Sequence, residues 1–178
     1  MEEKNGLIIV HTGNGKGKTT AALGLAMRAW GDGLNILILQ FIKGQWKCGE
    51  LETIKKLNEI DGRIEVRRMG KGFQRQTTDK TEHGEAAQEA LREARRAFES
   101  NKYDLIILDE INYAVKFELI SVNDVKELLS YRPKNLHVVL TGREAQADIL
   151  DMADLVTEMK LIKHPFQKGI KAQKGIEF

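Results

Sequence analysis

The chain has 178 residues and a formal net charge of +2, from 28 lysine and arginine residues against 26 aspartate and glutamate residues. This mild, interspersed charge argues against a nucleic-acid partner and against binding to an anionic membrane surface. The single cysteine, Cys48, excludes an intrachain disulfide and favours a reducing, cytoplasmic location, and no apolar run is long enough to cross a membrane.

The first predicted elements are a strand at residues 7–10 and a helix at residues 18–30, joined by a glycine-rich turn. The sequence from residue 11 to residue 20 reads His-Thr-Gly-Asn-Gly-Lys-Gly-Lys-Thr-Thr. A strand, a glycine-rich turn and Gly-Lys-Thr before a helix is the order that a phosphate-binding loop requires. Glycines let backbone N–H groups approach phosphate oxygens, and the helix N-terminus attracts anions. We therefore expect the chain to bind a nucleoside triphosphate.

Individual residues of this turn have predicted roles. Lys18 supplies a positive charge to the phosphates, and the Thr19 hydroxyl is expected to bind Mg²⁺. The general pattern has its first glycine where this chain has Thr12, so the loop is one residue tighter, and Lys16 is an additional cation. The residues predicted to bind the nucleotide are Gly13, Asn14, Gly15, Lys16, Gly17, Lys18, Thr19 and Thr20.

Apolar runs with strand character alternate with helical patterns along the rest of the chain. Strands are predicted at residues 35–41, 64–69, 105–108, 137–141 and 155–162. Helices are predicted at residues 50–58, 82–100, 121–131 and 145–152. Several strands are almost continuous in Ile, Leu and Val, which is typical of parallel strands covered on both faces. The pattern predicts one α/β domain over residues 1–178, with a doubly wound, mostly parallel sheet between helices.

Two loops follow the second and third predicted strands. In the first loop, Phe41 and Trp46 either stack on a flat ligand or close the edge of the core. The second loop, residues 69–77, contains two glycines and Phe73 and fits no regular element. Ligands bind at the carboxyl ends of strands in such folds, so this second loop is predicted to be a binding loop.

Charged residues follow the next two predicted strands. Asp109 and Glu110 come directly after residues 105–108, where carboxylates can hold Mg²⁺ directly or through water beside the phosphates. Glu110 has a second possible role, which is to orient a reacting group. Arg143 follows residues 137–141 and either pairs with phosphate or is a surface arginine in a turn.

Together these segments resemble the ATP:corrinoid adenosyltransferases of the P-loop type, which act on cob(I)alamin or cob(I)yrinic acid a,c-diamide. The resemblance extends from about residue 7 to residue 178, and the tight loop with its extra lysine is that family's own version. The motifs that carry it are Thr12-Gly-Asn-Gly-Lys-Gly-Lys-Thr-Thr20, Gln40-Phe-Ile-Lys-Gly44 with Trp46, Gly49 and Glu50, Gly72-Phe73, Leu108-Asp-Glu110 with Tyr113, Thr141-Gly-Arg143, Lys163-His-Pro-Phe166 and Gly169-Ile-Lys-Ala-Gln-Lys-Gly-Ile176.

The resemblance implies a reaction, a cofactor and a P-loop, RecA-like fold. In the family, Co(I) of a corrinoid attacks C5′ of ATP, inorganic triphosphate leaves, and a cobalt–carbon bond to a 5′-deoxyadenosyl group forms. By matching position, Lys18, Glu110 and Arg143 are the implied catalytic residues. The implied cofactor is Mg²⁺, and its implied ligands are Thr19, Asp109 and Glu110.

The resemblance also implies a corrin site over the loop around Phe73, where aromatic residues keep the lower axial position of cobalt free of ligands. Family members read Gly-Phe-Thr-Trp-Glu-Thr there, whereas this chain has Arg75 in place of the tryptophan. Arginine stacks on flat rings but is charged. We expect either a differently held corrin, or a changed activity or a changed preference among cobalamin, cobyrinic acid diamide and cobinamide.

Further expectations follow from the family. The tail at residues 163–178 is expected to pack near the active site, and the chain is expected to form a homodimer and to use a flavin-type reductant protein. Some members cover the site with an N-terminal extension, and here only residues 1–6 precede the first predicted strand. No such cover is therefore expected.

Two other functions remain open on the sequence alone. A P-loop ATPase or phosphotransferase would cut a phosphoanhydride, use a base or water-positioning residue beyond Glu110, and release ADP. A non-catalytic module would bind nucleotide or corrinoid in order to regulate or deliver it, and Arg75 is the feature that favours this reading. The phosphate product distinguishes the three functions.

Overall fold

The computed structural model describes residues 5–44, 48–72 and 80–177, and its centre is a six-stranded parallel sheet. The strand order is β3-β2-β4-β5-β1-β6. The strands are β1 (Ile8–Thr12), β2 (Ile36–Gln40), β3 (Ile64–Arg68), β4 (Leu105–Asp109), β5 (His137–Thr141) and β6 (Leu155–Glu158). The predicted α/β class with a parallel sheet is confirmed.

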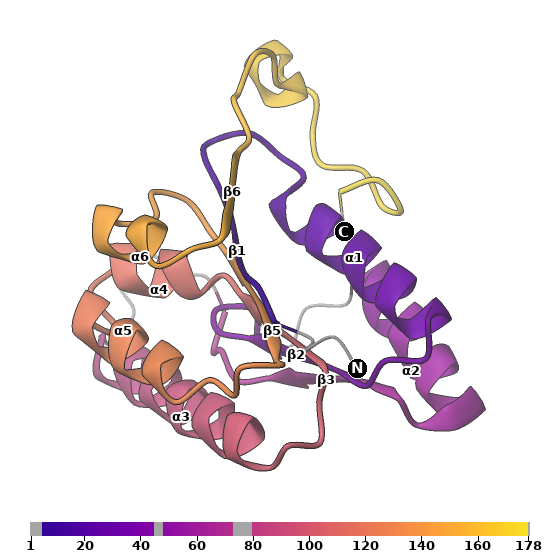
Figure 1. Cartoon of the computed structure of the whole chain (residues 1–178). Coiled ribbons are helices and arrows are strands. Elements are labelled where there is room, and N and C mark those ends of the chain that lie inside the picture. The colour runs from indigo at the N-terminus through magenta and orange to yellow at the C-terminus, as the bar shows by residue number, and fades with distance from the viewer. Residues whose placement is uncertain (1–4, 45–47, 73–79, 178) are drawn as a thin grey trace.

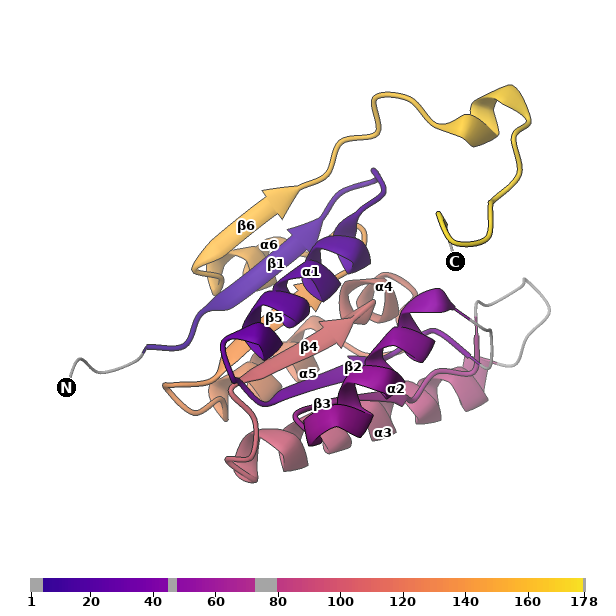
Figure 2. The same ribbon diagram turned by 90° about the vertical axis from the view of Figure 1, so that its right-hand side faces the viewer.

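Helices cover both faces of this sheet, as Figures 1 and 2 show. One face carries α1 (Lys18–Gly31) and α2 (Gly49–Asp61). The other face carries α3 (Lys80–Glu99), α4 (Ile111–Lys116), α5 (Val122–Ser130) and α6 (Ala147–Asp151). A short 3₁₀ helix, η1 (Pro165–Lys168), lies in the C-terminal segment, away from the sheet. No helix in the described part of the chain is long and apolar enough to span a bilayer.

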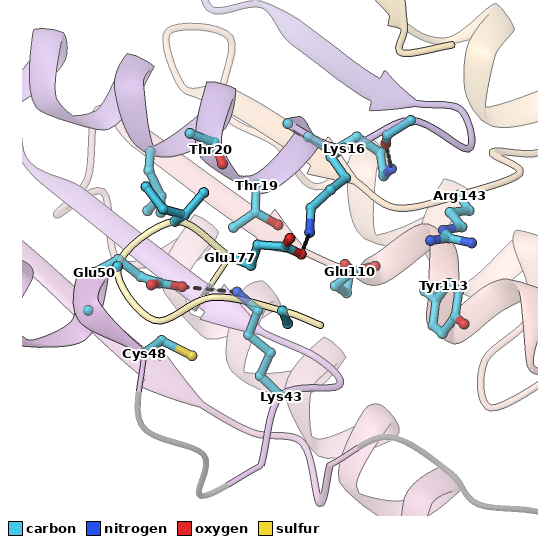
Figure 3. A pocket seen from close by; sticks show the side chains of 18 of the residues that line it. Lys16, Thr19, Thr20, Lys43, Cys48, Glu50, Glu110, Tyr113, Arg143 and Glu177 are labelled. Atoms are coloured by element: carbon cyan, nitrogen blue, oxygen red, sulfur yellow. Dashed lines mark hydrogen bonds and ion pairs between the residues drawn. The ribbon is translucent and has the colours of Figure 1, made fainter. Parts of the chain in front are cut away.

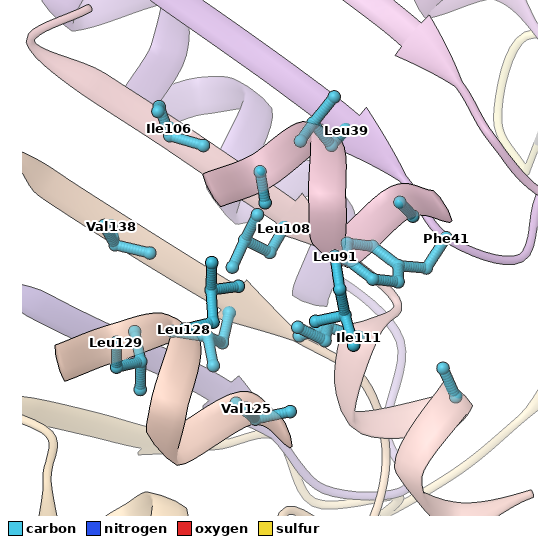
Figure 4. Close-up of a cluster of buried hydrophobic side chains, with 14 of the residues drawn as sticks. Leu39, Phe41, Leu91, Ile106, Leu108, Ile111, Val125, Leu128, Leu129 and Val138 are labelled. Atoms are coloured by element: carbon cyan, nitrogen blue, oxygen red, sulfur yellow. The ribbon is translucent and has the colours of Figure 1, made fainter. Parts of the chain in front are cut away.

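The four inner strands, β1, β2, β4 and β5, are covered on both faces, and most of their residues are apolar. In β4, Ile106 and Leu108 pack with the helices α3 to α6, whereas Leu105 and Ile107 pack with α1 and α2. Figure 4 shows the larger of these two clusters, to which both Leu108 and Ile111 belong. Burial of one such side chain contributes about 1.5–3 kcal/mol, so the two apolar layers hold the sheet between the helices.

Helix α4 was not predicted from the sequence. It begins at Ile111, directly after β4 and Glu110, and its buried residues Ile111, Ala114 and Val115 face the core. A helix of six residues has too few turns to show a periodic pattern, and the acidic pair before it resembles an ordinary strand end. This helix fixes the direction in which the chain leaves β4.

Strand β6 is shorter than predicted, because it ends at Glu158 rather than at residue 162. The N–H of Met159 donates to the carbonyl oxygen of Thr12 at 2.9 Å, and the Met159 carbonyl accepts from Gly15 at 2.6 Å. The chain therefore leaves the sheet along the loop that follows β1. As an edge strand, β6 is exposed along its whole length, which explains its weak strand pattern.

Candidate functional site

The P-loop, which comprises residues 11–17, connects β1 to α1. Helix α1 begins at Lys18, so its first backbone N–H groups lie at the loop. Lys18 is 8% exposed, and its Nζ donates to the carbonyl oxygens of Gly13 at 2.8 Å and Gly15 at 2.6 Å. Burial lowers the pKa of Lys18, while Glu110 opposes this shift and Arg143 adds to it. The ammonium is thus held within the loop, on partners that phosphate oxygens can replace.

Two glycines of the P-loop allow the chain that leaves β6 to pass close to it. Gly13 has a φ of +93°, and a Cβ there would lie 2.6 Å from the carbonyl oxygen of Met159. A Cβ at Gly15 would lie 2.7 Å from the carbonyl oxygens of both Met159 and Lys160. These distances leave no room for a side chain, so the shape of the loop depends on glycine at both positions.

Asp109, at the carboxyl end of β4, organises the polar side chains around it. It is fully buried, and its Oδ1 accepts hydrogen bonds from the hydroxyls of Thr19 and Thr141, each at 2.8 Å. Its Oδ2 accepts from the amide of Gln40 at 3.3 Å and lies 3.5 Å from Nζ of Lys43. One carboxylate therefore connects α1 with the ends of β2, β4 and β5.

Glu110 follows Asp109 and has an unusual backbone conformation. Its φ is +65°, a left-handed value that non-glycine residues seldom adopt, and its N–H donates to the Thr141 hydroxyl at 2.9 Å. Burial raises the pKa of Glu110 to about 7, with Asp109 acting in the same direction and three nearby cations opposing it. Glu110 therefore exchanges its proton near neutral pH.

Lys43 lies in the segment after β2 and pairs with two carboxylates. Its Nζ is 3.2 Å from Oε1 of Glu50, in the first turn of α2, and 3.5 Å from Asp109. Burial acts to lower the pKa of Lys43, but the two carboxylates outweigh it, and the pKa is raised. The Lys43 ammonium therefore stays charged at neutral pH.

These groups surround one cavity of about 950 Å³. Figure 3 shows how side chains from the P-loop, from the start of α2 and from the ends of β2, β4 and β5 come together around it. The C-terminal segment closes another side, where Glu177 pairs with Lys16. The cavity is lined by Gly15, Lys16, Gly17, Lys18, Thr19, Thr20, Leu23, Lys43, Gly44, Cys48, Gly49, Glu50, Gly72, Glu110, Tyr113, Arg143, His164, Ala172, Gly175, Ile176 and Glu177.

Most of the residues predicted from the sequence meet at this cavity. Residues 15–20 of the nucleotide-binding prediction line it, as do Glu110 and Arg143. Gly13 and Asn14 lie at the start of the loop, outside the lining, and Asp109 reaches the cavity through its bond to Thr19. The two predicted corrin contacts, Phe73 and Arg75, lie outside the residues that the structure describes, as does Trp46.

Several lining residues were not among the predicted site residues. Lys43, Glu50 and Tyr113 belong to the motifs behind the family resemblance but received no role of their own. Their position in the sequence could have identified them. Lys43 and Tyr113 follow the ends of the strands β2 and β4, and Glu50 lies in the first turn of α2. The Lys16–Glu177 pair has no local signal, since 161 residues separate its members.

The donor set at Thr19 and Asp109 suits Mg²⁺. A hydroxyl that donates its hydrogen to a carboxylate, as Thr19 does to Asp109, presents oxygen lone pairs to a cation. The buried Oε1 of Gln40 has no hydrogen-bond partner, and a water bound to the metal would supply one. The described residues contain no group of three or more His, Cys, Asp or Glu side chains arranged around a metal. Such a site relies on phosphate oxygens and water for the other ligands, as Mg²⁺ sites usually do.

The fold is shared with proteins of distant sequence. The crystal structure of the flagellar accessory protein FlaH from Methanocaldococcus jannaschii superposes with a TM-score of 0.60 at 13% identity, over 87% of this chain and 71% of that one. The likeness, together with the P-loop and the parallel sheet, confirms the predicted RecA-like P-loop fold.

Similarity over almost the whole sequence shows the family to which the chain belongs. The model of the family described as ATP:corrinoid adenosyltransferase BtuR/CobO/CobP matches residues 4–178. This chain belongs to that family. The corrinoid adenosyltransferase of Sinorhizobium sp is 42% identical over 99% of this chain and 82% of its own length. That of Escherichia coli (strain K12) is 40% identical over 99% of this chain and 88% of its own length. The predicted enzyme class, an ATP:corrinoid adenosyltransferase with ATP and a corrinoid as substrates, is confirmed.

Proposed function

We propose that this adenosyltransferase moves the 5′-deoxyadenosyl group of ATP to Co(I) of a corrinoid and releases inorganic triphosphate. Cobalt supplies the electron pair of the new cobalt–carbon bond, and the bond between C5′ and the α-phosphate oxygen breaks with its electrons on triphosphate. The observation that carries the proposal is the gathering of Lys16, Lys18, Lys43 and Arg143 around one cavity at the P-loop. Such a cluster suits a leaving group with several negative charges.

The four cations reach the cavity from different elements. Lys18 and Lys16 belong to the P-loop, Lys43 approaches from the end of β2, and Arg143 from the end of β5. Groups that are held in place before the reaction stabilise developing charge without reorganising. We assign Lys18 and Arg143 to the leaving triphosphate, and Glu110 to the orientation of the reacting groups.

Mg²⁺ would be held by the hydroxyl of Thr19, with Asp109 and Glu110 as ligands directly or through water. When bound, Mg²⁺ neutralises part of the charge that accumulates on triphosphate. Asp109 keeps the Thr19 hydroxyl in position through the hydrogen bond of 2.8 Å, and the Gln40 amide in turn holds Asp109. Asp109 and Gln40 would therefore orient the Thr19 hydroxyl for binding the metal.

We propose that the corrin ring is held by the loop that contains Phe73 and Arg75. The described part of the chain supports this proposal at one point, because Gly72, the last described residue before residues 73–79, lines the cavity. Arg75 in place of the family tryptophan would stack on the ring and add a positive charge. The preferred corrinoid is therefore expected to differ from that of relatives with tryptophan.

We also propose that the chain works as a cytoplasmic homodimer and takes its electron from a flavin-type reductant protein. Light scattering on the purified protein tests the first part, with an expected mass of twice the 20.1 kDa of one chain. Replacement of the chemical reductant by a reduced flavoprotein in the activity assay tests the second.

One assay tests the proposed reaction. The protein is incubated with ATP, Mg²⁺ and chemically reduced cobalamin, and the phosphate product is identified by chromatography. We expect inorganic triphosphate together with a light-sensitive organocobalt spectrum. ADP with free phosphate would indicate a P-loop ATPase or phosphotransferase, and binding of both substrates without product would indicate a carrier. Either of these results would overturn the proposal.

A further inference from the structure

The C-terminal segment places a carboxylate inside the cavity of the P-loop. Glu177 pairs with Nζ of Lys16, and its side chain is 14% exposed. By contrast, residues 165–176, which precede it, are all exposed. Figure 3 shows the Glu177 carboxylate directed at Lys16, on the side of the loop that faces the cavity. An acidic side chain therefore lies against a P-loop lysine at the cavity.

The backbone of the P-loop contacts the same segment. The N–H of Gly15 donates to the carbonyl oxygen of Met159 at 2.6 Å. Met159 begins the segment that leaves β6, and Glu177 lies near its end. Backbone N–H groups and lysine ammoniums are the groups with which a P-loop binds phosphate oxygens. Here the Gly15 N–H and the Lys16 ammonium both bond to the chain's own C-terminal segment.

The charge pattern of this segment distinguishes Glu177 from its neighbours. Residues 160–178 contain five lysines and a single acidic residue, which is Glu177. A basic segment is repelled by the cations of the P-loop, and only its carboxylate is attracted. The position of Glu177 is therefore best explained by its negative charge.

We propose that Glu177 is an internal competitor of the phosphate chain for Lys16. It pairs with Lys16 while no phosphate occupies the subsite and leaves Lys16 when the phosphates of ATP bind. This inference rests on the proposed function, because that function assigns the P-loop to the phosphates. It adds that the affinity of the site for polyphosphate is set by the chain's own carboxylate.

The Lys16–Glu177 ion pair is weak enough for phosphate to replace Glu177. The Lys16 side chain is 50% exposed, and ion pairs with such exposure are weak, so an anion with several charges displaces Glu177. The Glu177 end of the segment is bonded locally, since its N–H donates to the carbonyl of Gln173 at 2.8 Å. Exposed segments with local bonds open without disturbing the core. After the reaction, the return of Glu177 to Lys16 would favour release of triphosphate.

The test is a calorimetric titration of the full chain with inorganic triphosphate, in the absence of corrinoid. Glu177→Gln removes the competing charge, and we expect about two- to fivefold tighter binding, the range that corresponds to an exposed ion pair. Glu59→Gln, at an exposed position of α2, changes net charge equally and is expected to bind as the wild type does. Adenosine, which has no phosphate, is expected to bind both variants equally well.

A second comparison tests the role of Lys16. In a Lys16→Met background, Glu177→Gln is expected to give no further gain, because the shared partner is gone. Equal or weaker triphosphate binding by Glu177→Gln, or the same gain in the Lys16→Met background, would overturn the inference. Loss of triphosphate binding by the wild type would instead contradict the proposed function. A failed adenosylation assay does not affect the titration, so the two failures are distinguishable.

Discussion

Lys18 is the cation most closely integrated into the P-loop, through its bonds to the carbonyl oxygens of Gly13 and Gly15. We expect Lys18→Ala to lower kcat by about 10²–10³-fold, because a charge that stabilises the leaving triphosphate is lost. The measurement is the initial rate of organocobalt formation, with folding checked by circular dichroism. Lys55→Ala, at an exposed position of α2, serves as the control and is expected to keep full activity. An unchanged rate in Lys18→Ala would refute the role of this residue.

Glu110 gives the stability of the protein a pH dependence of predictable sign. Its pKa is raised from 4.5 to about 7, so between these values the folded chain holds a proton that the unfolded chain has lost. Stability therefore falls as pH rises through this window, by up to about 3 kcal/mol. Urea denaturation without divalent metal, from pH 5 to pH 8, measures the slope. Glu110→Gln is expected to flatten it, and equal slopes would show that Glu110 titrates normally.

At the level of residues, the sequence predicts the positions of side chains within a single motif. It does not predict contacts between residues that are far apart in the sequence. Lys18 and Thr19 follow from the order of strand, turn and helix, and they line the cavity as expected. The contact of Lys43 with Asp109 depends on β2 and β4 being neighbours, which no local pattern specifies. Glu177 depends on the path of the whole C-terminal segment.

At the scale of the elements, the P-loop packs closely against the start of the C-terminal segment, and this close approach requires glycine in the loop. A Cβ at Gly13 would clash with Met159, and the φ of +93° disfavours any side chain. We expect Gly13→Ala to destabilise the protein by about 1–3 kcal/mol and to weaken triphosphate binding. Thermal denaturation and calorimetric titration measure the two effects.

A matched control lies one element further along the chain. A Cβ at Gly24, in the middle of α1, meets nothing within 4 Å. Gly24→Ala is therefore expected to raise the free energy of unfolding by about 0.5–1 kcal/mol, because alanine favours the helix. If both substitutions changed stability equally, the close packing at Gly13 would not explain the need for glycine.

Strands and helices were predicted correctly where they are long enough and buried enough to show a clear pattern of apolar residues. All six predicted strands are present: β1, β2, β4 and β5 are buried, largely apolar runs inside the sheet, and the edge strands β3 and β6 begin where expected. The errors have local causes. Helix α4 is short and follows a left-handed turn at Glu110, and β6 ends early because Met159 bonds to the P-loop instead of continuing along the sheet.

At the scale of the whole molecule, ligand binding at the P-loop is expected to stabilise the fold. A ligand at 100 times its Kd contributes about 2.7 kcal/mol. For a chain of this size, 1 kcal/mol corresponds to roughly 2–4 °C, so saturating magnesium triphosphate is expected to raise Tm by roughly 5–10 °C. Differential scanning fluorimetry measures the shift. The Lys18→Ala variant is expected to show a much smaller one, and an equal shift in both proteins would place the anion elsewhere.

The buried carboxylate of Asp109 has a consequence for the energetics of binding. Because it connects Thr19, Gln40 and Thr141 by hydrogen bonds, side chains from three strands and one helix already have fixed rotamers before a substrate arrives. Little conformational entropy then remains to be lost by the side chains around Asp109 when a ligand binds. The C-terminal segment differs, because under the proposed exchange Glu177 leaves Lys16 when phosphate binds, so sequence changes there would tune affinity without disturbing the side chains around Asp109.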